Sequence, residues 1–155
     1  MVNLDETSAS VQSHLGIIQG VIQRMATNST SCKTWCTTIV SAILVAVSDK
    51  KNPDLSWVSI FPAILFAILD AYYLALEKGF RNSYKTFVKK LHNGTLSPED
   101  LYSISTEGGK IKTHFEAITS FSIWGFYIPL IILALIVKHL IISNLGSASQ
   151  FPFYK

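Results

Sequence analysis

The sequence predicts an all-α integral membrane protein with two or three transmembrane helices, extended by cytoplasmic amphipathic helices. Hydrophobic residues make up 49% of the 155 residues and charged residues only 15%, whereas about 25% of a typical soluble domain is charged. The mean hydropathy is +0.35, and the apolar residues gather in three long blocks. This pattern argues against a disordered chain and against an ordinary soluble enzyme.

Residues 10–31, before the first block, are expected to form an N-terminal amphipathic helix. Its apolar stripe has the spacing of a coiled-coil seam and consists of Val11, Leu15, Ile18, Ile22 and Met25. Barely two heptads are present, so packing within one subunit and self-association explain the stripe equally well. The polar run Asn28–Ser31 is expected to break the helix and to cap the first span.

The three apolar blocks are residues 34–48, 55–76 and 117–137. A helix needs about 20 apolar residues to cross a hydrocarbon core of ~30 Å, and the second and third blocks reach that length. The first block has 15 residues and covers only about 22 Å. It spans if Lys33 snorkels and the bilayer thins, or if the helix continues past the interface. A protein with two spans and a docked or re-entrant third block is an alternative.

The distribution of lysine and arginine predicts the orientation in the membrane. Nine basic residues lie before the first block or between the second and third blocks, and four lie in the other segments. Basic residues concentrate in cytoplasmic loops. Three spans therefore predict a cytoplasmic N-terminus and an external C-terminus.

Residues 77–116 form the expected cytoplasmic segment between the second and third blocks. Phe80–Leu91 should continue the second span as an amphipathic helix that ends at Asn93-Gly94. Ser97 should cap a further short helix. The pair Gly108-Gly109 is expected to form a hinge-like break before the third block.

A basic stripe follows one face of the helix that extends the second span. It comprises Lys78, Arg81, Lys85 and Lys89. Aromatic residues, including Tyr84, lie between these positions. Basic groups neutralise phosphates and aromatic rings stack on bases, so the stripe suits a nucleotide or a short single-stranded nucleic acid. The composition alone favours contact with anionic lipid headgroups, in which case Arg24 on the N-terminal helix is the remaining candidate for a nucleotide.

Polar residues also recur in or beside the membrane blocks, where ionisable groups are costly and tend to be paired or functional. They comprise Lys33, Asp70, Tyr73 and Glu77. If the first two spans form a hairpin, facing residues have numbers that sum to about 103. Lys33 then lies opposite Asp70, and Arg24 comes near Glu77 if the helix breaks between them. Such pairs either pin the hairpin or have a gating or proton-linked role.

Small hydroxyl residues share one face of the first block. They are Thr34, Thr37, Ser41 and Ser48. Residues of this kind let membrane helices pack closely. In an oligomer, the same face could line a wet pore.

No catalytic or cofactor-binding motif is present, so we expect neither an enzyme nor a bound cofactor. The four histidines are scattered along the chain. Cys32 and Cys36 have no second pair of ligands nearby, which favours two free thiols over a zinc site.

Three stretches of the sequence carry a family resemblance. The first is Arg24-Met25-Ala26 with Asn28-Ser29, Lys33, Trp35 and residues 38–42. The second is residues 69–74 with Glu77, Phe80-Arg81 and Tyr84, and the third is Ser122-Ile123 with residues 125–127 and Pro129-Leu130. Over roughly residues 20–137 the chain resembles the SLATT-type membrane proteins.

The resemblance implies a small effector of bacterial anti-phage defence in the inner membrane. Such proteins form homo-oligomers, a tetramer being favoured, and open a pore that stops growth of the infected cell. Their partner is a nucleotidyltransferase whose nucleotide product controls the pore. Similar proteins include the channel effectors of Hailong defence systems, in which short DNA from the partner enzyme restrains the channel.

The family usually has two spans, so the third apolar block departs from its pattern. An alternative function is a non-conducting membrane scaffold that recruits a partner protein through its amphipathic helices.

Overall fold

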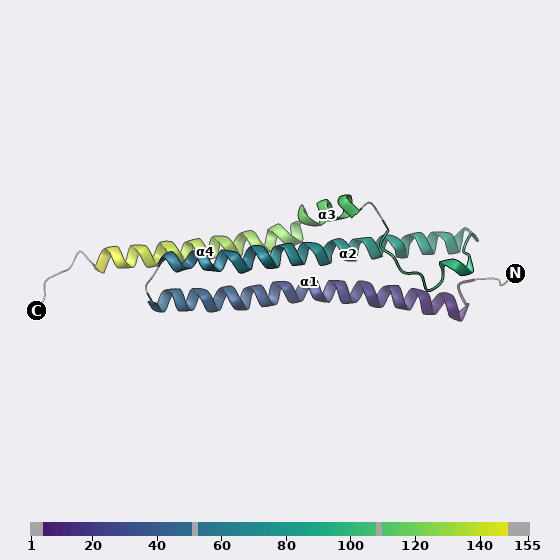
Figure 1. Cartoon of the computed structure of the whole chain (residues 1–155), viewed down its shortest axis with the longest axis horizontal. Coiled ribbons are helices and arrows are strands. Elements are labelled where there is room, and N and C mark those ends of the chain that lie inside the picture. The colour runs from purple at the N-terminus through teal and green to yellow at the C-terminus, as the bar shows by residue number, and fades with distance from the viewer. Residues whose placement is uncertain (1–4, 51–52, 108–109, 149–155) are drawn as a thin grey trace, which may run out of the picture. The chain divides into compact units, whose positions relative to one another are not determined.

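The computed structural model describes residues 5–50, 53–107 and 110–148. As the sequence predicts, these residues form helices and turns, and no strand occurs among them. The elements are α1 (Ala9–Lys50), the 3-10 helix η1 (Pro53–Ser59), α2 (Ile60–His92), the 3-10 helix η2 (Pro98–Asp100), α3 (Lys110–Ile118) and α4 (Phe121–Ala148) (Figure 1). The break expected at Gly108-Gly109 lies outside the described residues.

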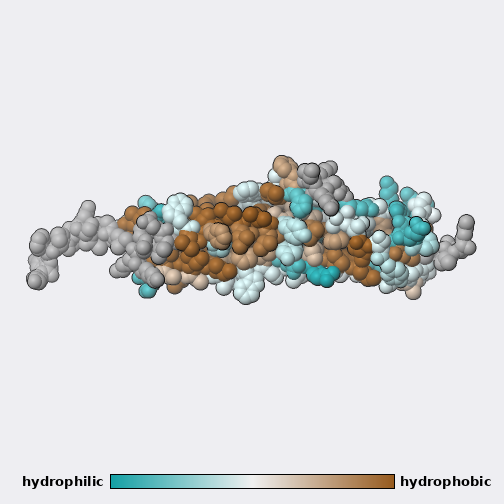
Figure 2. Space-filling model, viewed as in Figure 1, coloured by the Kyte–Doolittle hydropathy of each residue, from teal (hydrophilic) through white to brown (hydrophobic). Residues whose placement is uncertain are grey.

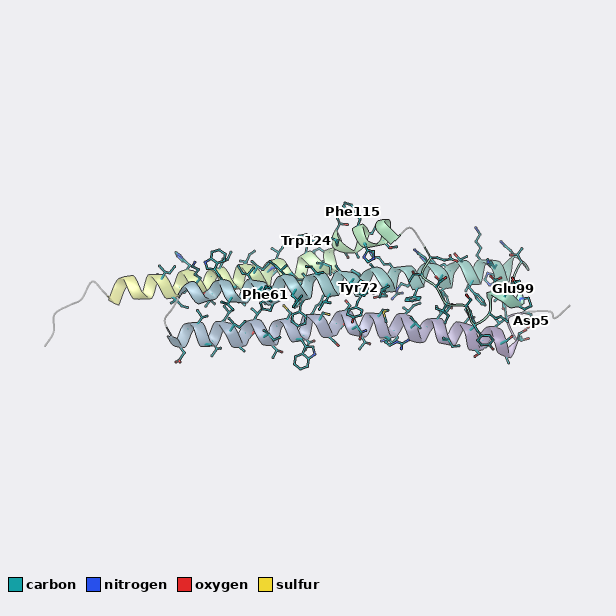
Figure 3. The ribbon with its side chains drawn as sticks, viewed as in Figure 1. Asp5, Phe61, Tyr72, Glu99, Phe115 and Trp124 are labelled. Atoms are coloured by element: carbon teal, nitrogen blue, oxygen red, sulfur yellow. The ribbon has the colours of Figure 1, made fainter. Side chains whose placement is uncertain are left out.

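Three helical stretches are long and apolar enough to cross a membrane, namely Ala9–Asp49, Ser56–His92 and Phe121–Ser143. The last of these lies in α4, whose exposed side chains are as apolar as its buried ones. Trp124 (Figure 3) and Leu140 are exposed, for example, whereas Ile141 is buried. Figure 2 shows apolar side chains gathered over α4. A helix that is apolar all round suits a lipid environment, so the chain is an all-α protein of the membrane-embedded type.

α1 is one uninterrupted helix of 42 residues, about 63 Å long. The helix break expected at Asn28–Ser31 is therefore wrong. Ser29 is buried by packing. Just after the run, the Thr34 hydroxyl donates to the carbonyl of Thr30 in its own helix, at 3.2 Å. Polar side chains satisfied in this way need not end a helix. The short first block thus lies within a helix long enough to cross a bilayer.

The other boundaries agree in part with the sequence pattern. α2 continues the second block without a break to His92, as predicted, while η1 takes the first residues of that block. Gly94 follows with a φ of +65°, a left-handed conformation that glycine adopts without steric cost. The first residues of the third block complete α3, and α4 extends beyond that block to Ala148.

The chain divides into two compact units. The polar unit consists of residues 5–29 and 71–118, and the apolar unit of residues 30–70 and 119–148. Within each unit α1 and α2 pair in the predicted register. Gln19 bonds Tyr84 in the polar unit and Lys33 pairs with Asp70 in the apolar unit, with residue numbers that sum to 103 in both cases.

The core of the apolar unit is formed by α1, α2 and α4. Its buried side chains include Cys36, Val40, Leu44, Val47, Ala63, Ile123, Tyr127, Ala134 and Ile141. The Tyr127 hydroxyl donates to the carbonyl of Phe66 at 3.1 Å. Lys138 Nζ lies 4.5 Å from the centre of the Trp57 ring, a cation–π contact. Both interactions connect α4 to the segment formed by η1 and α2.

Candidate functional site

The apolar stripe of the N-terminal part of α1 packs inside the polar unit. Val11 and Ile18 are almost fully buried, as is His14 between them. Phe87 of α2 is buried as well. Packing within one subunit, one of the two alternatives for this stripe, therefore accounts for its most buried positions.

A groove of about 560 Å3 lies between α1 and α2 of the polar unit. From α2 it is lined by Arg81, Tyr84 and Lys85, three of the residues that the sequence nominated for ligand binding. From α1 it is lined by Gln19, Ile22 and Gln23. The Gln19 amide donates to the Tyr84 hydroxyl at 3.4 Å.

The other nominated residues lie elsewhere. Lys78 Nζ donates to the carbonyl of Glu116 at 2.8 Å, where it satisfies a carbonyl at the end of α3. Lys89 and Arg24 are exposed and are not among the residues that line the groove. Three of the six residues that the sequence nominated for ligand binding therefore line the groove.

The chemistry of the groove suits an anion such as a phosphate or a carboxylate. Arg81 bonds Glu77 through Nε at 2.8 Å, and its two terminal amino groups have no partner among the described residues. A guanidinium binds phosphate or carboxylate through such paired donors. Lys85 adds a second positive charge, and Tyr84 adds an aromatic ring on which a base can stack.

No family model, curated protein or solved structure matches the chain. The functional assignment therefore depends on the chemistry of the chain's own residues.

A buried ion pair lies in the apolar unit. Lys33 Nζ is 2.5 Å from Asp70 Oδ2, and the Asp70 side chain is fully buried, which confirms the predicted pair. A buried carboxylate is tolerated when it is paired, and removal of one partner leaves an uncompensated charge.

The second predicted pair, Arg24 with Glu77, is wrong. Glu77 instead pairs with Arg81, one turn along α2. Both pairs together required a break at Asn28–Ser31, and α1 continues through these residues. Tyr73, the remaining member of the predicted network, contacts the edge of the Tyr72 ring at 5.7 Å.

The hydroxyl residues of the first block lie on the exposed side of α1. Thr34, Thr37, Thr38, Ser41 and Ser48 are all exposed. Successive residues turn by about 100°, which places these five, together with Val45, which is 70% exposed, on one flank of the exposed side, here called the hydroxyl flank. The other flank, here called the apolar flank, carries Trp35, Ile39, Ala42 and Ala46. The hydroxyl flank is therefore not occupied by packing within the described part of the chain.

Sequence reasoning missed the α1 side of the groove and a histidine beside it. Gln19 and Gln23 belong to no recognisable motif. The sequence shows only that they flank the apolar stripe and that the hairpin register brings them near Tyr84. His14 lies within the stripe, three residues after Val11 and four before Ile18, and this spacing was its only signal. In the part of the chain that the structure describes, no cluster of His, Cys, Asp or Glu could hold a metal ion.

Proposed function

We propose that the protein is a homo-oligomeric pore or ion-channel effector of bacterial anti-phage defence, located in the inner membrane with its N-terminus in the cytoplasm. Opening of the pore would arrest growth of the infected cell. A nucleotide or short oligonucleotide, made by a partner nucleotidyltransferase, gates it.

The exposed hydroxyl flank of α1 carries this proposal. Its side chains occupy one flank of a helix in the apolar unit, and packing against the residues that the structure describes does not bury them. Some bond back to their own helix, as where Thr37 donates to the carbonyl of Lys33 at 3.0 Å. Subunits that turn their hydroxyl flanks toward a common axis would surround a wet lumen, with the apolar flanks toward lipid.

The groove supports control by an anionic ligand. It is built from the same two helices, α1 and α2, that continue into the apolar unit. A ligand that binds the closed and open arrangements with different affinity shifts the balance between them.

Ion flux separates this function from that of a non-conducting scaffold. The purified full-length protein, freed of nucleotides, is reconstituted into liposomes loaded with an ion-sensitive dye. A pore predicts flux that depends on the protein, and a scaffold predicts none. Absence of flux from correctly inserted protein would contradict the proposal.

Two matched variants of α2 test whether the groove binds the controlling ligand. Lys85→Gln removes a positive charge from the groove, whereas Lys89→Gln removes one just outside it. With a single-stranded oligodeoxynucleotide as the probe, Lys85→Gln should weaken binding and Lys89→Gln should not. Equal loss in both variants would indicate nonspecific attraction, and unchanged binding in both would move the site away from the groove.

The orientation has its own test. A reporter fused after Lys155 should read as external if three spans follow a cytoplasmic N-terminus. A cytoplasmic signal from that reporter would favour two spans.

A further inference from the structure

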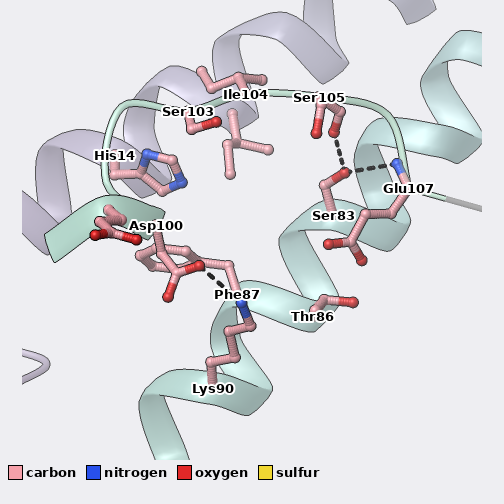
Figure 4. A pocket seen from close by; sticks show the side chains of 12 residues that line it. His14, Ser83, Thr86, Phe87, Lys90, Asp100, Ser103, Ile104, Ser105 and Glu107 are labelled. Atoms are coloured by element: carbon pink, nitrogen blue, oxygen red, sulfur yellow. Dashed lines mark hydrogen bonds and ion pairs between the residues drawn. The ribbon is translucent and has the colours of Figure 1, made fainter. Parts of the chain in front are cut away.

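A polar cavity of about 130 Å3 lies between α1, α2 and the segment that leaves α2. This segment, residues 95–107, is here called the strap, and it includes η2. Figure 4 shows the strap passing over His14 of α1 and over Ser83 and Phe87 of α2. All of these groups belong to the polar unit.

His14 is buried in the polar unit. Its side chain is 1% exposed, and it precedes the first block by 20 residues in the sequence. Its ring centre is 4.3 Å from that of Phe87, and its Nδ1 accepts a hydrogen bond from the Tyr102 N–H at 2.9 Å. A ring nitrogen that accepts carries no proton, so this bond requires a neutral imidazole protonated on Nε2.

Tyr102 of the strap has an unusual backbone conformation. Its φ is +60°, in the left-handed region that bulky residues rarely adopt. The bond to His14 uses the backbone N–H of this same residue, and the Tyr102 ring meets the His14 ring edge-on at 6.4 Å. His14 therefore holds the strap at its most strained residue.

Several hydrogen bonds to α2 also hold the strap. For example, Asp100 accepts from Lys90 Nζ at 2.7 Å, and the Ser83 hydroxyl accepts from the Glu107 N–H at 3.0 Å. None of them needs a group that titrates near neutral pH in its ordinary state. Among these attachments, only the one at His14 depends on an imidazole, which does titrate in that range.

The charged groups around the cavity are Lys90 from α2, and Glu99, Asp100 and Glu107 from the strap. Burial lowers the pKa of His14 from its ordinary value of 6.5, and the charge of Asp100 opposes this effect. The hydrogen bond from Lys90 lowers the pKa of Asp100 from 3.8. Asp100 therefore stays ionised while His14 titrates.

We propose that His14 is a proton-operated latch, which releases the strap from α1 when the imidazole takes up a proton from solvent. Protonation turns Nδ1 into a donor that faces the Tyr102 N–H, so the bond is lost and a cation is left in a buried position. The strained Tyr102 can then relax. The strap leads through α3 to α4, so the latch controls how firmly the chain between α2 and α4 is held, whether or not the protein conducts ions.

A spin label on the strap tests the latch. Ser103 is exposed, and Ser103→Cys in a Cys32→Ala, Cys36→Ala background carries one nitroxide on the full chain in nanodiscs. Its mobility is followed by electron paramagnetic resonance from about pH 8 to about pH 5. With His14 present, mobility should rise on acidification, with a midpoint below 6.5 because the folded state opposes protonation.

Two substitutions of His14 separate the latch from simple packing. His14→Asn places an amide oxygen near the position of Nδ1 and cannot be protonated, so the label should stay immobile at every pH. His14→Phe keeps a ring against Phe87 but loses the acceptor, so the label should be mobile at every pH.

His92 provides the control. It is exposed and lies 3.3 Å from Glu6, so His92→Asn should leave the transition unchanged. A label whose mobility does not change with pH when His14 is present would overturn the latch. A transition that persists in His14→Asn, or disappears in His92→Asn, would overturn it as well.

Discussion

The polar and apolar units share α1 and α2 but are stabilised in different ways. In the apolar unit the exposed surface of α4 is as apolar as the core, and the Lys33–Asp70 pair is buried. In the polar unit the ion pairs lie nearer the surface, and hydrogen bonds attach the strap to the two helices. Loss of one member of a charged pair should therefore lower the free energy of unfolding most where no water can replace the missing partner.

The largest effect is expected from Asp70→Ala in the apolar unit. The substitution removes the carboxylate that pairs with Lys33 in a largely buried position, and should lower the free energy of unfolding by about 3–5 kcal/mol. The double variant Lys33→Met, Asp70→Leu should recover much of this loss, because it removes both charges. Denaturant unfolding in detergent micelles measures both values.

Glu77→Ala is the matched control in the polar unit. It removes a pair within one helix whose Arg81 partner is 57% exposed, so it should cost less than about 1 kcal/mol. If the double variant at Lys33 and Asp70 is no more stable than Asp70→Ala, the ion pair does not explain why these residues are buried together.

An intermediate effect is expected where the strap crosses α2. A Cβ added at Gly79 would lie 2.9 Å from the Cβ of Thr106, so Gly79→Ala should destabilise the protein by about 1–3 kcal/mol. Gly16, also in a helix of the polar unit, has nothing within 4 Å of the added Cβ. Gly16→Ala should stabilise it by about 0.5–1 kcal/mol. Unfolding free energies that rise in both variants would contradict the packing of the strap at Gly79.

The smallest effect is expected at the Lys90–Asp100 pair of the strap. Asp100→Asn should lower the free energy of unfolding by less than about 1 kcal/mol near neutral pH. The hydrogen bond from Lys90 lowers the pKa of Asp100 from 3.8, so the contribution is present above that pH and is lost as the pH falls through the lower folded value. The free energies of unfolding of the unmodified protein and of Asp100→Asn should converge as the pH falls into the acid range. A difference that does not change with pH would show that the contribution of Asp100 is not electrostatic.

The sequence carried enough information for the hairpin. Two long apolar blocks joined by a short loop allow one antiparallel register, and that register placed Lys33 opposite Asp70, as observed. The short helix at Pro98, with Ser97 at its N-terminus, and the end of α2 at Gly94 were also predictable, because caps and glycine turns are local signals.

Features that depend on distant residues were not predictable. The run Asn28–Ser31 has the composition of a helix break, but Ser29 is buried by packing and α1 continues through the run. In the sequence, the members of the basic stripe are equivalent candidates for ligand binding. Only the position of α1 shows that Lys85 lines the groove and that Lys89 lies outside it. The role of His14 depends on Tyr102, 88 residues away, and no spacing rule reaches that far.

The proposal that the hydroxyl flank of α1 lines a pore can be tested by the accessibility of single cysteines in liposomes. Ser41→Cys lies on the hydroxyl flank, Ala46→Cys on the apolar flank, and Val40→Cys in the core of the apolar unit. In a background without Cys32 and Cys36, each is exposed to a charged, water-soluble thiol reagent during ion flux and again when flux is blocked. A pore lined by the hydroxyl flank predicts modification of Ser41→Cys only during flux, and protection of Ala46→Cys and Val40→Cys in both states. Equal protection of Ser41→Cys in both states would contradict it and would make the hydroxyl flank a packing surface between subunits.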